Sequence, residues 1–390
     1  MLSTPQAPLS QPLKVIFMGT PDIAVPCLTH LYTLHQQAAW LTLKGIVTQP
    51  DRPSGRGQKL TPPAIKACWQ AHHTLGVEGI LLFQPERLSK SEEVLAWLVS
   101  QAPDVIVTMA FGQILPQSVL DIPRLGVVNV HASLLPRWRG ANPIASAILH
   151  GDEETGLTTM KTVMQVDAGD MLLKASCPIT MTDTTLSLSC TLATLAGPLL
   201  EKTLYGLYDG TLTPIPQKDA EVTHAPKMSK DDTWVHWHQQ DALTLHRRMR
   251  AYTPWPGNTT YWQDKRVKLS SPLLPNALTL QGLQARVSHS EAPVVAGTLV
   301  AQGLLLETSL LDTTRSPVWI YLSENEFLGV ETLQLEGKTS TSATLWLQQQ
   351  GIHALVPCVS QSEPLFKTAN LEDARLRFHT PCTSVEGATH

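Results

Sequence analysis

The sequence predicts an α/β fold, in which a doubly wound, mostly parallel sheet is followed by a smaller β-rich domain. Short apolar and β-branched runs alternate with helical stretches over the first half of the chain. After a polar stretch at 209–226 that contains three prolines, short strand-like pieces alternate with turn residues from Val267 onward. Alternating strands and helices favour parallel strand pairs with helices packed on both faces of the sheet.

The predicted elements of the first half follow one another in a regular order. We expect strands at residues 14–18, 43–48, 80–83, 105–109 and 127–130. We expect helices at residues 23–34, 63–72, 91–100 and 143–150, followed by a longer helix at 184–208. In sheets of this kind, ligands bind beyond the carboxyl ends of the strands. In this chain that position falls on Met109, Asn129 and His131.

Pattern and composition together divide the chain into four segments. We expect an α/β domain at 13–208, a linker at 209–226, a second domain at 227–350 and a loosely ordered extension at 351–390. The second domain begins with a predicted helix near 242–251 and continues with the short strands of a small barrel. We find no internal repeat.

Composition excludes several classes of protein. Of the 390 residues, 43% are hydrophobic and 16% are charged, which is typical of a folded globular protein. No apolar run approaches the roughly 18 residues of a membrane span, and the start of the chain, MLSTPQAPLSQPLK, has no targeting pattern. We therefore expect a cytoplasmic protein that does not contact a membrane.

Two kinds of cofactor site are disfavoured by their missing motifs. The six cysteines are scattered and form no CxxC pair, so neither a zinc site nor a disulfide framework is indicated. The turn after the first strand, Gly19-Thr20-Pro21, lacks the later glycines of the GxGxxG fingerprint. We therefore expect no metal and no dinucleotide-dependent hydride transfer.

A polar cluster marks the candidate site. In the run VVNVHASLLPRWRGANP, which begins at Val127, Asn129 and His131 lie two residues apart on a predicted strand and therefore face the same way. Asp167, in the loop VDAGD, can hold the imidazole in one tautomer. Taken singly, Asn129 could cap a turn, His131 could be a core histidine, and Asp167 could lie in a surface turn. Together they form a set suited to proton transfer and carbonyl polarisation.

With their flanks, these residues resemble the catalytic Asn, His and Asp of the 10-formyltetrahydrofolate-dependent formyltransferases. The hallmark of that superfamily is NVHxSLLPxxxGxxP followed by a DxGD-type loop, and both order and spacing match here. Within the superfamily, the sequence is most similar to the methionyl-tRNA formyltransferases from about Leu13 to Leu347. The shared motifs, in order, are VIFMGTPDIA, VTQPDRPSGRGQKLTPP, MAFGQILP, GDEETG, KMSKDD and AYTPWPGN.

The resemblance implies a formyl transfer from 10-formyltetrahydrofolate without a metal. Asn129 would donate a hydrogen bond to the formyl oxygen, His131 would handle protons as acid or base, and Asp167 would orient His131. The resemblance also implies a set of folate contacts: Ser133, Leu134, Leu135, Pro136, Phe111, Gly112, Gln113, Ile114, Leu115, Gln165 and Val166. The chain departs from the family at Gln165-Val166, where Gly-Leu usually precedes the aspartate.

A basic loop indicates the second substrate. The formal net charge of −4 argues against a protein that coats nucleic acid, but the stretch from Asp51 to Lys66 is locally basic. By resemblance, this loop enters the acceptor stem of a charged initiator tRNA, and the second domain is an OB-like barrel that also contacts tRNA. The candidate contacts are Arg52, Arg56, Lys59, Lys227, Lys230, Arg247 and Arg248, of which Arg56 matches the arginine that reads the end of the acceptor stem in the resembling family. In an arbitrary protein, such charges would form an ordinary solvated surface.

Three functions follow from these observations. The first is formylation of methionyl-initiator-tRNA by a monomeric enzyme. The second is a related small-molecule formyltransferase or a 10-formyltetrahydrofolate hydrolase, against which the arginine-bearing loop argues. The third is a non-catalytic RNA-binding protein, against which the complete set of Asn129, His131 and Asp167 argues.

Overall fold

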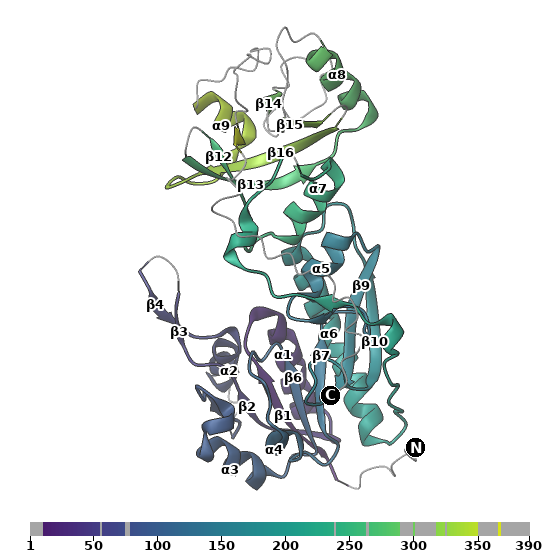
Figure 1. Ribbon diagram of the computed structural model, residues 1–390. Coiled ribbons are helices and arrows are strands. Elements are labelled where there is room, and N and C mark those ends of the chain that lie inside the picture. The colour runs from purple at the N-terminus through teal and green to yellow at the C-terminus, as the bar shows by residue number, and fades with distance from the viewer. Residues whose placement is uncertain are drawn as a thin grey trace, which may run out of the picture. The chain divides into compact units, whose positions relative to one another are not determined.

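The computed structural model describes residues 11–54, 57–74, 79–237, 239–262, 265–288, 299–300, 317–323, 326–349 and 366–367 (Figure 1). The chain forms two compact units, Met1–Met228 and Ser229–His390. No helix among these residues is long and apolar enough to cross a membrane.

The first unit is built on a seven-stranded sheet with the order β10-β9-β7-β6-β1-β2-β5. Its parallel strands are β1 (Leu13–Gly19), β2 (Leu41–Val47), β5 (Leu81–Phe83), β6 (Val105–Met109) and β7 (Val127–His131). The central strand β1 pairs with β2 on one side and with β6 on the other. The chain thus extends the sheet from β1 in both directions, which is the doubly wound arrangement. The predicted fold class is therefore confirmed.

Two antiparallel strands that the sequence patterns did not identify extend this sheet. β9 (Glu154–Lys161) pairs with β7, and β10 (Met171–Pro178) pairs with β9. β9 reaches the carboxyl end of β7 at Thr158, which is opposite His131, and runs back until Lys161 is opposite Val128. The loop after β9 therefore starts at the far end of β7 from His131.

Helices cover both faces of the sheet. α1 (Val25–Gln37) and α6 (Thr185–Tyr208) pack on each other and on one face, and α5 (Pro143–His150) adjoins α6. The other face is covered by α3 (Glu92–Gln101) and α4 (Gln117–Leu120), whose apolar side chains join a buried cluster with Ile16 and Met18. α2 (Ala64–Thr74) lies against α1. Each of the predicted helices is present, with ends shifted by a few residues.

The segment 209–226, expected as a linker, packs along the first unit. Ile215 forms a two-bond backbone bridge with Met171, and β11 (His224–Ala225) pairs in parallel with β8 (Arg139–Gly140). Gly140 has a φ of +121°, and a Cβ there would lie 2.5 Å from the carbonyl oxygen of Ala225. Only glycine allows this close approach.

The described strands of the second unit form a curled antiparallel sheet (Figure 1). Its path is β14-β15-β16-β13-β12-β18, with β17 paired to β16. The strands are β12 (Asn258–Trp262), β13 (Lys265–Leu273), β14 (Leu299–Val300), β15 (Val318–Ser323), β16 (Glu326–Leu335), β17 (Thr341–Ser342) and β18 (Phe366–Lys367). The helices are α7 (Ala242–Ala251), α8 (Ala277–Ser288) and α9 (Ala343–Gln349). This smaller, curled β domain agrees with the predicted OB-like class.

The carboxyl-terminal extension expected at 351–390 lies mostly outside the described residues. Its described part is β18, in which Phe366 and Lys367 pair with Trp262 and Tyr261 of β12.

Arg248 requires a correction, because the structure gives it a structural position rather than an RNA contact. Its side chain on α7 is only 6% exposed. The guanidinium donates to the carbonyl oxygens of Asp232 and Trp234 and to Oδ1 of Asn258, and it stacks on Tyr252 at 4.8 Å. A phosphate cannot reach a group that is buried and already satisfied in this way. The prediction took the arginines of α7 to be exposed, because the sequence does not show which face of a helix is covered.

We expect Arg248→Met to destabilise the second unit by about 2–4 kcal/mol, because it leaves several buried acceptors without a donor. Urea unfolding followed by tryptophan fluorescence measures this change. Arg247→Met is the matched control, because Arg247 is next along α7 and half-buried. Equal stabilities of the two variants would contradict the structural role of Arg248.

Candidate active site

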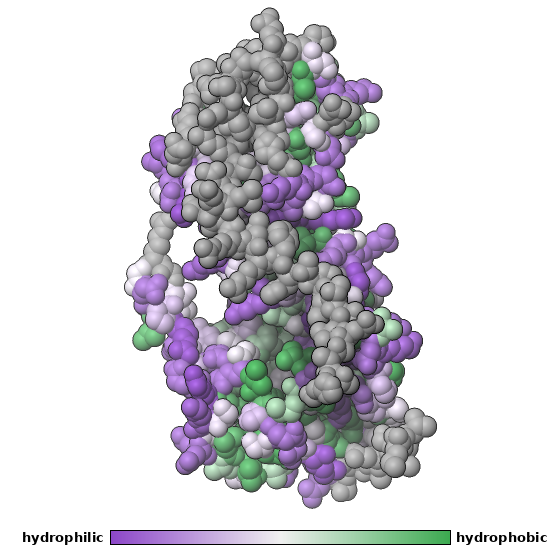
Figure 2. Space-filling model, in the orientation of Figure 1, coloured by the Kyte–Doolittle hydropathy of each residue, from purple (hydrophilic) through white to green (hydrophobic). Residues whose placement is uncertain are grey.

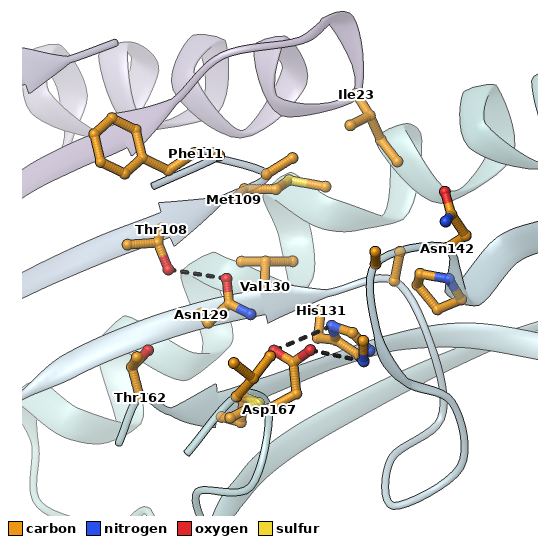
Figure 3. Close-up of a pocket in the computed structure, with 18 of the residues that line it drawn as sticks. Ile23, Thr108, Met109, Phe111, Asn129, Val130, His131, Asn142, Thr162 and Asp167 are labelled. Carbon is orange, nitrogen blue, oxygen red and sulfur yellow. Dashed lines mark hydrogen bonds and ion pairs between the residues drawn. The ribbon is translucent and has the colours of Figure 1, made fainter. Parts of the chain in front are cut away.

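A cavity of about 440 Å³ lies at the carboxyl ends of β6 and β7 (Figure 3). Its walls come mainly from residues 108–115, 129–132 and 140–145, with further residues from the loop that follows β9. Most of the lining is apolar, and a few polar groups converge on it, as is usual for a small-molecule site. Asn129, His131 and Asp167 all line this cavity, so the structure brings the three predicted residues together.

The side chain of Asn129 is oriented by Thr108 on the neighbouring strand. The two residues are paired in the β6–β7 register, and the Thr108 hydroxyl donates a hydrogen bond of 2.9 Å to Oδ1 of Asn129. With Oδ1 engaged, the amide nitrogen points along the strand toward His131 and Asp167 (Figure 3). Asn129 therefore presents a donor to the cavity. Sequence reasoning did not single out Thr108, because a threonine in a buried strand is an ordinary residue.

His131 has one nitrogen committed to the main chain. Its side chain is buried, and Nε2 lies 2.9 Å from the carbonyl oxygen of Trp138. Because a carbonyl only accepts hydrogen bonds, Nε2 carries the proton of this contact. Nδ1 lies 3.6 Å from Oδ1 of Asp167, an ion-pair distance rather than a hydrogen bond. Nδ1 is therefore the nitrogen left to exchange a proton.

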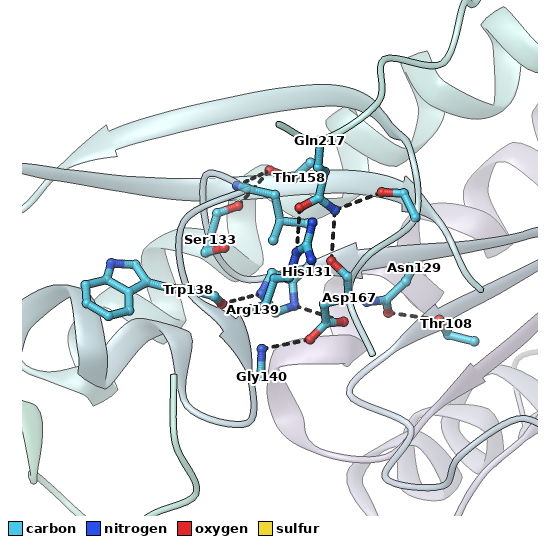
Figure 4. A network of polar contacts seen from close by, with 12 residues as sticks. Thr108, Asn129, His131, Ser133, Trp138, Arg139, Gly140, Thr158, Asp167 and Gln217 are labelled. Carbon is cyan, nitrogen blue, oxygen red and sulfur yellow. Dashed lines mark hydrogen bonds and ion pairs between the residues drawn. The ribbon is translucent and has the colours of Figure 1, made fainter. Parts of the chain in front are cut away.

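Asp167 is held by both its side chain and its backbone (Figure 4). Oδ2 accepts a hydrogen bond of 2.9 Å from the amide of Gly140. The residue adopts a φ of +51°, in the left-handed region that aspartate tolerates better than most residues. Its backbone carbonyl accepts a hydrogen bond of 2.8 Å from the side chain of Gln217. This second contact comes from the segment expected as a linker.

The carbonyl that binds His131 is itself fixed by a surface network. The indole of Trp138 donates 2.7 Å to Asp152, and the guanidinium of Arg137 pairs with Asp152 and stacks on the indole at 4.5 Å. Burial of Asp152 raises the pKa of its carboxyl, but the hydrogen bonds from Arg137 and Trp138 outweigh burial and hold that pKa below its usual value. Asp152 is therefore a stable anion that anchors Trp138.

The predicted folate loop forms one wall of the cavity. Phe111, Gly112, Gln113, Ile114 and Leu115 all line it. The loop is tethered at the Phe111 carbonyl, which accepts from the Thr20 hydroxyl at 2.9 Å and from the Gln49 amide at 3.3 Å. The side chain of Gln113 is engaged with the backbone at Leu88 and Pro85.

Exposed apolar side chains line the opening of the cavity. Ile114 is 77% exposed, and Val163, Met164 and Val166 are also exposed while lining the same cavity. Figure 2 shows hydrophobic side chains among hydrophilic ones on one face of the first unit. Gln165, predicted together with Val166, is exposed and does not line the cavity. Of the two residues that depart from the family pattern, Val166 therefore lines the cavity and Gln165 does not.

None of the four side chains of the SLLP segment lines this cavity. Ser133 is fully buried, and its hydroxyl donates 2.6 Å to the carbonyl of Arg137. Leu135 is buried against Met160 and Met171, Pro136 is buried, and Leu134 faces a different hollow. The segment shapes the turn between His131 and Gly140. A motif by itself does not separate contact residues from the residues that fix a turn.

The predicted tRNA contacts that the structure describes are not among the residues that line the cavity. Arg52 and Lys59 are exposed on a hairpin of β3 (Arg52–Ser54) and β4 (Lys59–Thr61), and Arg52 pairs with Glu86 at 2.6 Å (Figure 1). Arg56 lies outside the described residues. Lys227 and Lys230 are exposed and Arg247 is half-buried. Among the described residues, no cluster of histidine, cysteine, aspartate or glutamate could hold a metal ion.

Comparison with known proteins agrees with this arrangement. The family described as formyl transferase matches residues 13–204, and the family described as formyl transferase, C-terminal domain, matches residues 227–351. The methionyl-tRNA formyltransferase of Geobacter metallireducens is 44% identical over 257 residues, which cover 66% of this chain and 78% of that protein. The chain belongs to the methionyl-tRNA formyltransferase family.

Solved structures outside the methionyl-tRNA formyltransferase family share the fold. HypX from Aquifex aeolicus, in complex with tetrahydrofolic acid, gives a TM-score of 0.52 at 16% identity over 86% of this chain and 47% of that chain. WlaRD, a sugar 3N-formyl transferase crystallised in the presence of dTDP and 5-N-formyl-THF, gives a TM-score of 0.53 at 14% identity over 84% of this chain and 99% of that chain. At these identities the likeness concerns the fold alone.

We expect Thr108→Val to slow single-turnover formyl transfer by about 10-fold, because Asn129 loses the bond that aims its amide at the cavity. Valine keeps the shape and the strand preference of threonine, so the fold should be unaffected. Thr108→Ser is the control, since it retains the hydroxyl and should stay near the wild-type rate. Equal rates in the valine and serine variants would show that Thr108 does not orient Asn129.

Proposed function

We propose that this protein transfers the formyl group of 10-formyltetrahydrofolate to the α-amino group of methionyl-initiator-tRNA, giving N-formylmethionyl-tRNA. The observation that carries the proposal is the convergence of the Asn129 amide, His131 and Asp167 on one apolar-walled cavity. The tRNA substrate follows from relatives named methionyl-tRNA formyltransferase. A folate donor is supported by structural neighbours solved with tetrahydrofolic acid and 5-N-formyl-THF.

Asn129 stabilises the charge that develops during transfer. When the amine attacks the formyl carbon, the new carbon–nitrogen bond forms as negative charge moves onto the formyl oxygen. The amide nitrogen of Asn129 faces the cavity because Thr108 engages Oδ1, so it can donate a hydrogen bond to that oxygen. A donor fixed beforehand lowers the barrier because it needs no reorganisation during the reaction.

His131 moves the proton through Nδ1. The reaction removes one proton from the attacking amine and delivers one proton to the folate nitrogen that leaves, so a single base can serve both steps. Because Nε2–H is engaged with the Trp138 carbonyl, Nδ1 accepts the proton and later returns it. Asp167, 3.6 Å from Nδ1, stabilises the imidazolium that exists between these steps.

The cavity suits a flat, amide-like ring. Phe111, Ile114, Leu115 and the exposed Val166 provide apolar walls. We propose that the pteridine lies against the loop from Phe111 to Leu115, with Val166 altering the outer edge of the cavity. The catalysis outlined here uses no metal. We further propose that the enzyme is cytoplasmic, because charged initiator tRNA is used where translation starts, and that it acts as a monomer.

The direct test combines purified protein with 10-formyltetrahydrofolate and methionyl-initiator-tRNA and scores formylmethionine. Uncharged initiator tRNA and charged elongator tRNA are the controls. Sugar nucleotide amines test the small-molecule alternative, and release of formate without tRNA tests the hydrolase alternative. Formylation of a small amine at a higher kcat/KM than methionyl-initiator-tRNA would replace the proposed substrate.

We expect Asn129→Ala and His131→Ala to lower single-turnover formyl transfer by on the order of 100-fold or more, because both residues act on the reacting groups. The affinity for charged tRNA should stay within about twofold of wild type. Asp167→Asn should also slow the reaction and alter its pH dependence without unfolding the protein. Near-wild-type rates in the alanine variants would remove the catalytic assignment.

We expect Arg56→Ala to reduce kcat/KM for initiator tRNA and to narrow its advantage over elongator tRNA, because arginine offers bidentate contacts to phosphates and base edges. Lys59→Ala should mainly remove a phosphate contact, lowering the salt slope of binding by at most about one unit. Steady-state kinetics with both tRNAs at two salt concentrations measure both effects. If selectivity and salt slope both match wild type, the hairpin is ordinary solvated surface.

A further inference from the structure

We infer that Gln217 is a positioning residue for the reaction, because its side chain holds the backbone of Asp167 where the carboxylate reaches His131. This inference rests on the proposed role of Asp167. Gln217 lies in the segment between α6 and β11, which the sequence marks as a linker rather than as part of a site.

The Gln217 side chain makes three hydrogen bonds within the site, two as donor and one as acceptor (Figure 4). Nε2 donates to the carbonyl oxygens of Asp167 and Gly169, both at 2.8 Å. Oε1 accepts from Nε of Arg139 at 2.8 Å, and Arg139 is itself buried. A half-buried side chain with this many directed contacts is tightly fixed.

The chemistry of the partners leaves one orientation of the amide. Carbonyl oxygens accept only, so the nitrogen must face Asp167 and Gly169. A guanidinium donates only, so the oxygen must face Arg139. Turning the amide around would place oxygen against two carbonyls and nitrogen against a cation. Glutamine is therefore required as a donor on one side and as an acceptor on the other.

The loop that carries Asp167 needs such a tether because of the direction of β9. That strand ends with Lys161 opposite Val128, so the chain must fold back to bring Asp167 to His131. On its way Asp167 takes a left-handed conformation, with φ at +51°. Gly169 lies so close to Lys161 that a Cβ would meet the Lys161 carbonyl oxygen at 1.9 Å. Gln217 binds the loop at both of these constrained residues.

The same tether connects Asp167 to the turn that orients His131. Trp138 accepts from His131, Arg139 donates to Gln217, and Gly140 donates to the Asp167 carboxylate. These three residues are consecutive, so one short piece of backbone fixes the positions of both His131 and Asp167. Misplacing a catalytic group by about 1 Å can cost on the order of 100-fold in rate. We therefore expect loss of the Gln217 donors to slow the chemical step.

Gln217→Glu separates the two sides of this side chain. The carboxylate still accepts from Arg139, but it has no hydrogen to donate and faces two carbonyl oxygens. Gln217→Met keeps the length and removes all polar contacts. We expect single-turnover formyl transfer to fall about 10- to 100-fold in both, while Kd for methionyl-tRNA and KM for the folate donor stay within about twofold. Gln36→Glu, the same change at an exposed position of α1, is the matched control.

A double variant distinguishes positioning from general damage. If Gln217 acts through Asp167, adding Gln217→Glu to Asp167→Asn should slow the reaction by less than about twofold further, and both single variants should change the pH profile alike. A full additional 10-fold loss in the double variant, or a Gln217→Glu rate equal to the Gln36→Glu rate, would overturn the inference. If Asp167→Asn alone keeps the wild-type rate, the proposed role of Asp167 fails, and the positioning inference falls with it.

Discussion

The pairing of His131 with Asp167 depends on the turn that follows β7, and the rest of the site is arranged around it. The carbonyl of Trp138 fixes Nε2 of His131, and the amide of Gly140 fixes Oδ2 of Asp167. Trp138 has a φ of +65° and Gly140 a φ of +121°, so the turn itself needs support. Asp152 supports the turn by accepting a hydrogen bond from the Trp138 indole, and β11 supports it by pairing with β8.

This dependence explains why the site draws on elements far apart in the sequence. The parallel strands β6 and β7 place Thr108, Asn129 and His131 at one edge of the sheet. The antiparallel strand β9 then carries the chain away from that edge, and the following loop must return. Glycine at 169 and the donors of Gln217 make the return possible, so a residue far from the motif contributes to its geometry.

The charged residues divide into groups with different physical roles. Arg137, Arg139 and Arg248 donate to protein acceptors, and the last two are buried. Arg52, which also pairs with Glu86, and Lys59 are exposed on the β3–β4 hairpin, where a phosphate can approach. A net charge of −4 is thus compatible with a nucleic-acid substrate, because a few exposed cations at the contact matter more than the total.

The sequence by itself determined the fold class, the order of the parallel strands and helices, and the set of Asn129, His131 and Asp167. Local patterns suffice for the fold class and for Asn129 with His131, since strand residues two apart share a face and alternating elements favour a parallel sheet. Asp167 joined the set through its motif, whose order and spacing resemble those of the formyltransferases. Only the tertiary structure decided that SLLP turns inward, that Arg248 is buried, and that Thr108 and Gln217 hold Asn129 and Asp167. Burial and hydrogen bonds between residues many positions apart depend on how the elements pack, and no local pattern encodes that packing.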